Sequence, residues 1–363
     1  DRPPTLAAMK RVALLGATGS IGRQALEIIE SQPELELVAA ASGSTPIDGL
    51  APLVQVGGDL TDLLERAEPD VVLNAVVGFA GLPATLWALE HGIDLALANK
   101  ESLVAGGPLA TSAWERGGGR LLPVDSEHSA AFQLLDGRPP ETVGSLVLTA
   151  SGGPFRGRSR AELSGVTAEQ ALAHPTWSMG PKITVDSATL MNKGLELIEA
   201  HFLFALPYER IEVVVHPTSV VHALVRLRDG ASLAHLGYPD MRVPISYALT
   251  YPERAATPIE PLDLAGGLLL EFGAPDDEAF PCLRLARAAG ETGGTAPCVL
   301  NAANEVAVAA FLEGALPFPG IGDVVERTLT RVDPARADLL DELVAADAEA
   351  RRIASGLTRE LVH

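Results

Sequence analysis

The sequence is poor in several features that mark particular classes of protein. Only two cysteines, Cys282 and Cys298, occur among 363 residues, and they lack the CxxC spacing of a zinc site. No apolar run reaches the roughly 18 residues that a membrane-spanning helix needs. The first residues, Asp1-Arg-Pro-Pro, do not have the layout of a signal peptide. We therefore expect a cytoplasmic protein without a disulfide framework, in which both cysteines are buried apolar residues.

Positive charge is also scarce. The formal net charge is −20 at pH 7, which argues against nucleic acid or an anionic membrane as a partner. Four of the 27 basic residues are lysines, namely Lys10, Lys100, Lys182 and Lys193. Because arginine is so much more frequent than lysine, these lysines are candidates for tasks that need a compact ammonium group. Chance alone can also account for four lysines.

The composition and the order of predicted elements indicate a globular chain whose N-terminal part alternates strands and helices. Hydrophobic residues make up 47% and charged residues 20%, and the length allows two or three domains. An apolar strand at 11–15 leads into Gly16-Ala-Thr-Gly-Ser-Ile-Gly22 and then into a helix at 23–31. Glycines in this strand–turn–helix setting let a dinucleotide pyrophosphate approach the helix N-terminus. The next strand, 35–41, ends in Ser42-Gly-Ser-Thr45 without the acidic residue usual at an NAD site, which favours NADP.

Polar residues follow two further strands. The strand 94–98 runs into Asn99-Lys-Glu-Ser102, and ligands bind at the carboxyl ends of strands in open α/β sheets. The strand 121–124 runs into Asp125-Ser-Glu-His-Ser129. If this second segment stays extended, its two carboxylates lie on one side and suit a hard divalent cation. If it begins a helix, the same residues form an N-cap, and the sequence leaves both interpretations open.

The stretch 174–199 predicts an anion site beneath a lid. Its first part is rich in glycine and proline yet carries Trp177 and Met179, which is typical of a lid. We expect a helix from Asp186 to about Ala205, and a helix N-terminus with hydroxyls and a lysine nearby binds anions. On a helical wheel the apolar stripe leaves a separate polar arc, formed by Asn192, Lys193 and Glu196.

The rest of the chain changes character twice. A strand at 144–150 and a hairpin of two strands joined at Asp229-Gly230 indicate an α+β region. The sequence after residue 271 instead has helical periodicity. Nothing in Asn301-Ala-Ala-Asn-Glu305 demands chemistry beyond packing and the pairing of buried amides. We therefore expect an α/β and α+β multidomain fold with a Rossmann-like NADPH domain at 1–125, a central catalytic and dimerisation α+β domain at 126–250, a linker at 251–270 and an α-helical domain at 271–363.

Seven motifs, in order along nearly the whole chain, resemble one known family. They are Gly16 to Gly22, Leu97-Ala-Asn-Lys-Glu-Ser-Leu-Val104, Pro123-Val-Asp-Ser-Glu-His-Ser129, Ser151-Gly-Gly-Pro-Phe155, His174 to Glu199, Val215-His-Pro-Thr-Ser219 and Asn301 to Glu305. The sequence is similar in them to 1-deoxy-D-xylulose 5-phosphate reductoisomerase. That family makes 2-C-methyl-D-erythritol 4-phosphate with NADPH and a divalent cation (Mn²⁺, Mg²⁺ or Co²⁺) in non-mevalonate isoprenoid synthesis, and it is generally homodimeric.

The resemblance also implies a role for individual residues. Metal ligands would be Asp125, Glu127 and Glu196. Substrate contacts would come from Lys100, Ser126, Glu127, Ser151, His174, Ser187, Asn192, Lys193 and Glu196. NADPH contacts would come from Thr18, Gly19, Ser20, Ile21, Gly43, Ser44, Thr45, Asn99, Glu101 and Gly180. Trp177 and Met179 would belong to the closing lid.

The chain departs from the family at two places. Some members carry a basic residue where this chain has Ser44, which bears on the strength of the NADPH preference. Between Thr45 and Asp70 the chain is also short, because members typically have roughly thirty more residues before the Asn-Lys-Glu motif, where a doubly wound fold usually fits another strand–helix unit. Two alternatives stay open: the chain has lost a peripheral unit, or a disordered segment is absent from this sequence.

Two other functions compete with that of the family. One is a plain NADP dehydrogenase, which leaves the three carboxylates implied as metal ligands without a necessary role. The other is a silent NADP-binding sensor, which predicts decay of the polar motifs beyond the glycine loop. Those motifs are intact here, and this favours the reductoisomerase.

Overall fold

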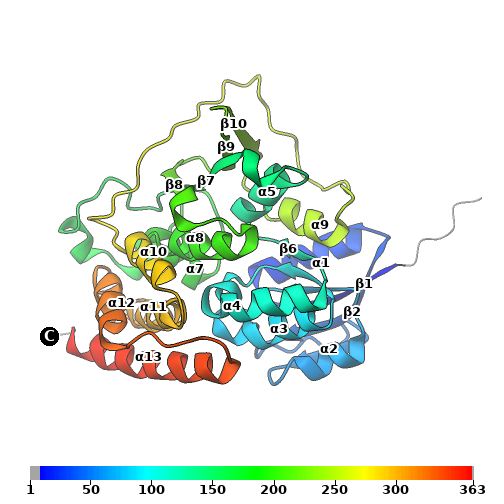
Figure 1. Cartoon of the computed structure of the whole chain (residues 1–363), viewed down its shortest axis with the longest axis horizontal. Coiled ribbons are helices and arrows are strands. Elements are labelled where there is room, and N and C mark those ends of the chain that lie inside the picture. The colour runs from blue at the N-terminus through cyan, green and yellow to red at the C-terminus, as the bar shows by residue number, and fades with distance from the viewer. Residues whose placement is uncertain (1–8, 362–363) are drawn as a thin grey trace, which may run out of the picture. The chain divides into compact units, whose positions relative to one another are not determined.

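The computed structural model describes residues 9–361 (Figure 1), and its internal contacts divide the chain into two units. The first unit comprises Asp1–Asn99, Ala110–Ser129 and Asp240–Glu260, and the second comprises Lys100–Leu109, Ala130–Pro239 and Pro261–His363. The expectation about a signal peptide concerns residues 1–4, which lie outside the described range. No helix within residues 9–361 combines the length and the apolar character needed to span a bilayer.

The first unit is built on a parallel sheet in the order β3-β2-β1-β4-β5-β6. Its strands are β1 (Lys10–Leu15), β2 (Leu35–Ser42), β3 (Leu53–Val56), β4 (Val71–Asn74), β5 (Asp94–Leu97) and β6 (Leu121–Pro123). Its helices are α1 (Ser20–Ser31), α2 (Thr61–Ala67), α3 (Leu82–Glu90) and α9 (Arg242–Thr250). The strands read as continuous apolar runs because the sheet is buried on both faces, and Val12 through Leu15 are fully buried. This order is the doubly wound one, so the Rossmann-like expectation is confirmed.

The connection between β2 and β3 is short and lies in the region where the chain is shorter than the family. Parallel strands are usually joined through a helix in a crossover of a dozen or more residues. Here residues 43–52 make the crossover without a helix, although β2 and β3 pair in parallel from Ala39 and Leu53 onward. The short region therefore still contains the strand β3 and the helix α2.

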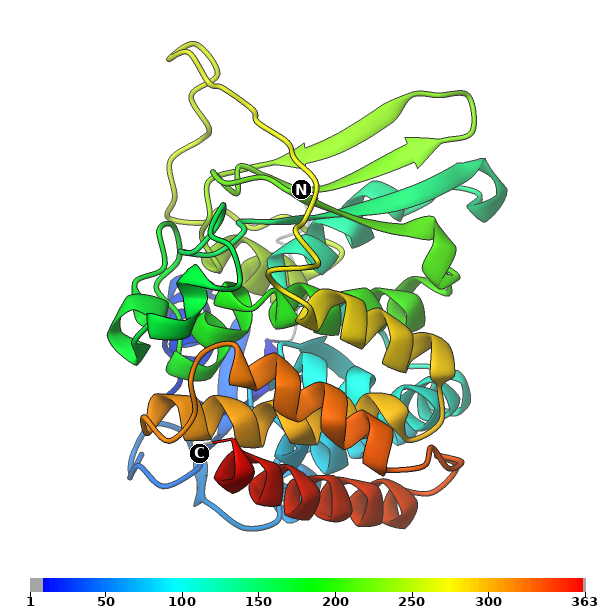
Figure 2. The same ribbon diagram turned by 90° about the vertical axis from the view of Figure 1, so that its left-hand side faces the viewer.

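The second unit contains a mixed sheet in the order β10-β9-β7-β8. The strands are β7 (Val143–Ala150), β8 (Ile211–Val215), β9 (Val221–Leu227) and β10 (Ser232–Leu236). The expected hairpin at Asp229-Gly230 is present, with Gly230 at φ +91°. Helices α10 (Cys282–Thr292), α11 (Ala296–Leu312), α12 (Gly320–Arg331) and α13 (Leu340–Glu360) pack against one another, coloured yellow to red in Figure 2.

The C-terminal helices share one apolar core with the elements before them. Helix α8 (Met191–Phe204) packs on α10 at Gly194, where an added Cβ would lie 2.5 Å from the Cβ of Ala286. Both cysteines are buried and free, as expected, and burial raises the pKa of Cys282 to about 12. The remaining helices are α4 (Lys100–Gly117), α5 (Ser126–Leu135), α6 (Ala168–Leu172) and α7 (Pro181–Ala188), with short 3-10 turns at Phe79–Gly81, Pro140–Thr142, Glu162–Gly165 and Tyr208–Arg210.

One predicted helix boundary is wrong. The sequence placed a helix start at Asp186, but this residue lies near the end of α7, and the next helix, α8, begins only at Met191. The break falls at Leu190, which adopts φ 62° and ψ 8°. Left-handed geometry is uncommon for leucine, so the residue type gave no sign of it. Asp186 and Ser187 therefore do not cap a helix N-terminus.

Candidate active site

The glycine-rich loop of the first unit is shaped by contacts that exclude side chains. Gly16 has φ +87°, and a Cβ there would lie 2.4 Å from the carbonyl oxygen of Ala75. A Cβ on Gly22 would lie 2.3 Å from the carbonyl oxygen of Gly16. Helix α1 starts after Gly19, which has no side chain to cap the first-turn amides. A helix N-terminus behind such a loop is a site for an anionic group such as a pyrophosphate.

Four other residues expected at a cofactor follow the carboxyl ends of two strands of the same sheet, β2 and β5. Gly43, Ser44 and Thr45 follow β2 and are exposed. Asn99 follows β5, and its side-chain amide donates to the carbonyl oxygens of Val76 at 2.6 Å and of Gly78 at 2.8 Å. The side chain of Asn99 thus holds the loop after β4 in place.

Asp125 caps helix α5, which is one of the two interpretations that the sequence left open. Its Oδ1 accepts from the backbone N–H of Glu127 at 3.2 Å and of His128 at 3.4 Å. The Ser126 hydroxyl donates to Glu127 Oε2 at 2.5 Å. The cap fixes the first turn of α5 and, with it, the direction in which the Glu127 side chain leaves the helix.

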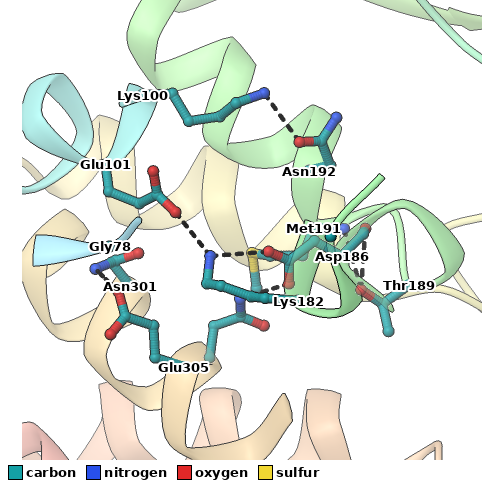
Figure 3. Close-up of polar contacts among 12 residues, drawn as sticks. Gly78, Lys100, Glu101, Lys182, Asp186, Thr189, Met191, Asn192, Asn301 and Glu305 are labelled. Carbon is teal, nitrogen blue, oxygen red and sulfur yellow. Dashed lines mark hydrogen bonds and ion pairs between the residues drawn. The ribbon is translucent and has the colours of Figure 1, made fainter. Parts of the chain in front are cut away.

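The second unit brings together four polar residues expected to contact substrate. Lys100 Nζ donates to Asn192 Oδ1 at 2.9 Å and to Glu196 Oε1 at 3.1 Å, and Figure 3 shows the first of these bonds. Asn192 Nδ2 donates to Glu196 Oε1 at 2.5 Å, and Lys193 Nζ pairs with Glu196 Oε2. Lys100, Lys193 and Glu196 are all buried.

Two ammonium groups, those of Lys100 and Lys193, face the single carboxylate of Glu196. Ammonium groups of this kind can pair with a phosphate or another anionic group of a ligand. The helical spacing of Asn192, Lys193 and Glu196 predicted their common face, whereas Lys100 comes from another element.

His174 joins two serines at the start of the loop before α7. Its Nε2 lies 3.1 Å from both the Ser151 and the Ser187 hydroxyl oxygens. Its Nδ1 accepts from the backbone N–H of Thr176 at 3.1 Å and of Trp177 at 2.9 Å. Burial lowers the pKa of His174. The ring is therefore neutral at pH 7, with Nε2 carrying the proton and Nδ1 holding the lid segment.

The rest of the expected lid follows directly. Trp177 and Met179 are half-buried, and the Trp177 ring lies 6.3 Å from the ring of His222. Gly180 ends the loop as the N-cap of α7, with an extended backbone. Both large apolar side chains thus belong to a loop that is neither fully buried nor held in a sheet, as a lid requires.

The structure also shows polar contacts that sequence reasoning missed. Lys182 Nζ donates to Glu101 Oε1 at 2.8 Å and to Asp186 Oδ2 at 2.9 Å, while Asn304 Nδ2 donates to Asp186 Oδ1 at 2.7 Å. Glu101 was expected at the cofactor, but its carboxylate is engaged by Lys182. Two signals could have pointed to Lys182, the rarity of lysine and the i,i+4 spacing to Asp186. Asn304 belongs to the motif Asn301 to Glu305, to which the sequence gave no role in the site.

The expected metal ligands come from both units. Asp125 and Glu127 belong to the first, and Glu196 belongs to the second. All three offer carboxylate oxygens and no sulfur, a donor set that suits Mg²⁺ or Mn²⁺.

Comparison with known proteins identifies the family of this arrangement. Profiles match for 1-deoxy-D-xylulose 5-phosphate reductoisomerase at residues 12–57 and 48–107, for its C-terminal domain at 121–204, and for the DXP reductoisomerase C-terminal domain at 236–353. The reductoisomerase of Geobacillus kaustophilus is 50% identical, with 94% of this chain and 98% of that protein covered. That of Xanthomonas axonopodis pv. citri is 48% identical, with 98% and 97% covered.

Solved structures agree with the sequences. The Zymomonas mobilis reductoisomerase in complex with NADPH has a TM-score of 0.88 at 42% identity, covering 97% of this chain and 100% of that one. A DOX-P reductoisomerase in complex with NADPH, fosmidomycin and magnesium has a TM-score of 0.90 at 37% identity, covering 97% and 99%.

Proposed function

The chain belongs to the 1-deoxy-D-xylulose 5-phosphate reductoisomerase family, and on that premise we propose which residues carry its reaction. The enzyme converts 1-deoxy-D-xylulose 5-phosphate to 2-C-methyl-D-erythritol 4-phosphate with NADPH and a divalent cation, in isoprenoid precursor synthesis. The observation that carries the assignment of the site is the buried cluster in which Lys100 and Lys193 flank the Glu196 carboxylate.

Substrate binding falls to the second unit and to the start of α5. Lys193 supplies positive charge for the substrate phosphate, and Ser187 and Asn192 supply hydrogen-bond donors. Lys100 faces the sugar oxygens from the other side of Glu196. The neutral His174 donates from Nε2, so it binds a substrate oxygen without adding charge. The full set is Lys100, Ser126, Glu127, Ser151, His174, Ser187, Asn192, Lys193 and Glu196.

Asp125, Glu127 and Glu196 hold the divalent cation. Their oxygen-only donor set fits a hard ion, which when bound supplies stabilisation of negative charge on the substrate oxygens. The chain's own part is orientation. Lys100 and Asn192 fix Oε1 of Glu196, Lys193 fixes Oε2, and the cap of α5 fixes the turn that carries Glu127.

NADPH, which supplies the hydride, binds at the glycine loop of the first unit. Thr18, Gly19, Ser20 and Ile21 present the amides of the α1 N-terminus, while the hydroxyls of Ser44 and Thr45 face the 2′-phosphate after Gly43. Asn99 and Glu101, whose side chains are already engaged, contact the cofactor through their main chain, as does Gly180. Trp177 and Met179 close over the bound molecules and exclude water.

A direct assay tests this function. We expect absorbance at the nicotinamide band to fall when the protein is mixed with 1-deoxy-D-xylulose 5-phosphate, NADPH and Mg²⁺ or Mn²⁺. The chain carries residues that we propose to bind the substrate, the cation and NADPH. Omitting the cation or adding a chelator should stop the loss. A folded protein that oxidised no NADPH in the complete mixture would refute the proposal.

We propose further that the protein acts in the cytoplasm as a homodimer, through an apolar surface of the second unit. We call it the strap surface. It consists of exposed residues at the end of β10 and in the segment 261–272, namely Leu236, Tyr238, Leu264, Leu269 and Phe272. The Tyr238 hydroxyl accepts from the Asp263 N–H, which ties the two parts together. Large exposed apolar patches mark association sites, and β10 is an edge strand with an open side.

The dimer should depend on the strap surface. Replacing both Leu264 and Leu269, which are 70% and 77% exposed, by glutamate should convert the dimer to a monomer because it places charge in the apolar contact. Sedimentation analysis would measure the change. Replacing Leu339, which is 62% exposed but lies outside the surface, by glutamate is the matched control and should leave the dimer intact. A wild-type monomer would rule the dimer out.

A further inference from the structure

Lys182 lies at the centre of a polar network for which the reaction as described has no use. It is in the first turn of α7, directly after the lid, and its ammonium group donates to Glu101 at 2.8 Å and to Asp186 at 2.9 Å. Figure 3 shows the ammonium group between the two carboxylates, which come from α4 and α7. The two bonds therefore tie together segments that are 85 residues apart in the chain, 101 and 186.

The bonding is strong enough to act as a fixed connection. Burial alone would lower the pKa of Lys182, but Asp186 and Glu101 outweigh burial, with a smaller contribution from Glu305, so the pKa is raised. Burial would likewise raise the pKa of Glu101, but Lys182 outweighs it and the pKa is lowered. Both groups are thus charged at neutral pH, and charge-assisted hydrogen bonds in a buried setting are short and directional.

Helix α11 supplies the other end of the connection. Asn304 donates to the second oxygen of Asp186 at 2.7 Å, and both residues are buried. Glu305, next in the chain, accepts from Asn301 at 2.9 Å and from Arg351 of α13 at 2.6 Å. The Asn301–Glu305 motif, to which the sequence assigned only packing, therefore anchors the Lys182 network in the C-terminal helices.

We propose that Lys182 is a positioning residue for the reaction, because each of its two partners is the chain neighbour of a substrate residue. Glu101 follows Lys100, and Asp186 precedes Ser187. By holding both carboxylates, Lys182 fixes the separation between Lys100 and Ser187 and sets where the lid ends. This inference rests on the proposed function, since it concerns the substrate residues assigned there.

Two substitutions test the role. Lys182→Met keeps the stem and removes the ammonium group, so the two segments should separate slightly, and a misplacement of about 1 Å costs about a hundredfold in kcat. Lys182→Arg keeps a donor for both carboxylates and should recover turnover to within about tenfold of wild type. Lys10→Met is the control, because Lys10 is a partly buried lysine of the first unit that donates to the Leu249 carbonyl at 2.9 Å. Its turnover should stay within about twofold of wild type.

A purely structural role makes a different prediction. Lys182→Met leaves two buried carboxylates without their partner, which destabilises the fold. Adding Asp186→Asn removes the more deeply buried of these charges and should restore the melting temperature. If Lys182 positions the substrate residues, kcat stays low in the double variant. If kcat returns to the wild-type value together with the melting temperature, or if Lys182→Met alone keeps full kcat, the inference is overturned.

Amide hydrogen exchange separates this inference from the proposed function. Lys182→Met should speed exchange at residues 99–103 and 185–190, and Lys10→Met should not, whether or not the protein turns over 1-deoxy-D-xylulose 5-phosphate. Unchanged exchange in those segments would overturn the positioning role. If the wild-type protein were inactive but showed the expected exchange pattern, the proposed function would be overturned. The link that Lys182 makes between Glu101 and Asp186 would still be supported.

Discussion

Replacing Glu196 by glutamine should lower kcat about a thousandfold and leave NADPH affinity within about twofold of wild type. Glu196 is fully buried, and its two oxygens accept from Lys100, Asn192 and Lys193. Glutamine keeps the size but removes the charge, and its amide nitrogen must face one of the two ammonium groups. A cation ligand is lost and a repulsive contact is introduced. A thousandfold corresponds to about 4 kcal/mol, the scale of charge stabilisation expected from a bound cation.

The measurement has two parts. Turnover is followed at saturating NADPH and varied Mg²⁺, and NADPH binding is followed by fluorescence without substrate. The matched control is Glu212→Gln, because Glu212 is a glutamate of the same unit whose carboxylate pairs with Arg226 at 2.6 Å, outside the site. Its kcat should stay within about twofold of wild type, as expected of a partly exposed pair. If Glu196→Gln destroyed NADPH binding and kept cation-dependent turnover, Glu196 would not be a metal ligand.

The parts of the fold that the sequence predicted are those set by short-range rules. The strands around Val12 and Val72 are apolar because the sheet is buried on both faces. Gly22, which lies against the Gly16 carbonyl, and Gly230, which has a positive φ, need glycine for steric reasons that act over a few residues. The common face of Lys193 and Glu196 follows from helical spacing alone.

The parts that the sequence did not predict depend on contacts between distant segments. Helix α4 is kinked at Gly106, and Gly107 beside the kink is needed because a Cβ there would lie 2.2 Å from the Phe202 ring. The break at Leu190 is imposed on a residue type that avoids it. Tertiary packing determines the backbone at both positions, and no local sequence pattern predicts it.

The polar contacts of the candidate site are likewise of two kinds, those that follow from local spacing and those that join distant segments. Lys182 and Asp186 are four residues apart in one helix, so their ion pair could have been read from spacing. Glu101 and Asn304 reach this pair from segments with no sequence relation to it. The roles of Asp125, Glu127 and Glu196 as metal ligands came from the family resemblance, because no spacing rule connects α5 with α8.

Replacing Gly22 by alanine should have the opposite effect to Glu196→Gln, with NADPH affinity lost and the substrate site kept. An alanine Cβ at this position would lie 2.3 Å from the Gly16 carbonyl oxygen and 2.7 Å from backbone atoms of Ala17. Backbone cannot rotate away as a side chain can, so the loop must shift relative to the start of α1. Amides aimed at a charged phosphate contribute about 1.5–3 kcal/mol each, and losing one or two of them weakens NADPH binding about a hundredfold.

Titration of NADPH fluorescence would measure the loss, with circular dichroism to show that the variant is folded. Gly356→Ala is the matched control, because Gly356 also lies inside a helix but has open space where a Cβ would sit, so alanine should leave NADPH affinity unchanged. At saturating NADPH the Gly22→Ala variant should keep most of its kcat, since Lys100 and Glu196 lie in the other unit. Unaltered NADPH affinity in folded Gly22→Ala protein would mean that the cofactor does not bind against this loop.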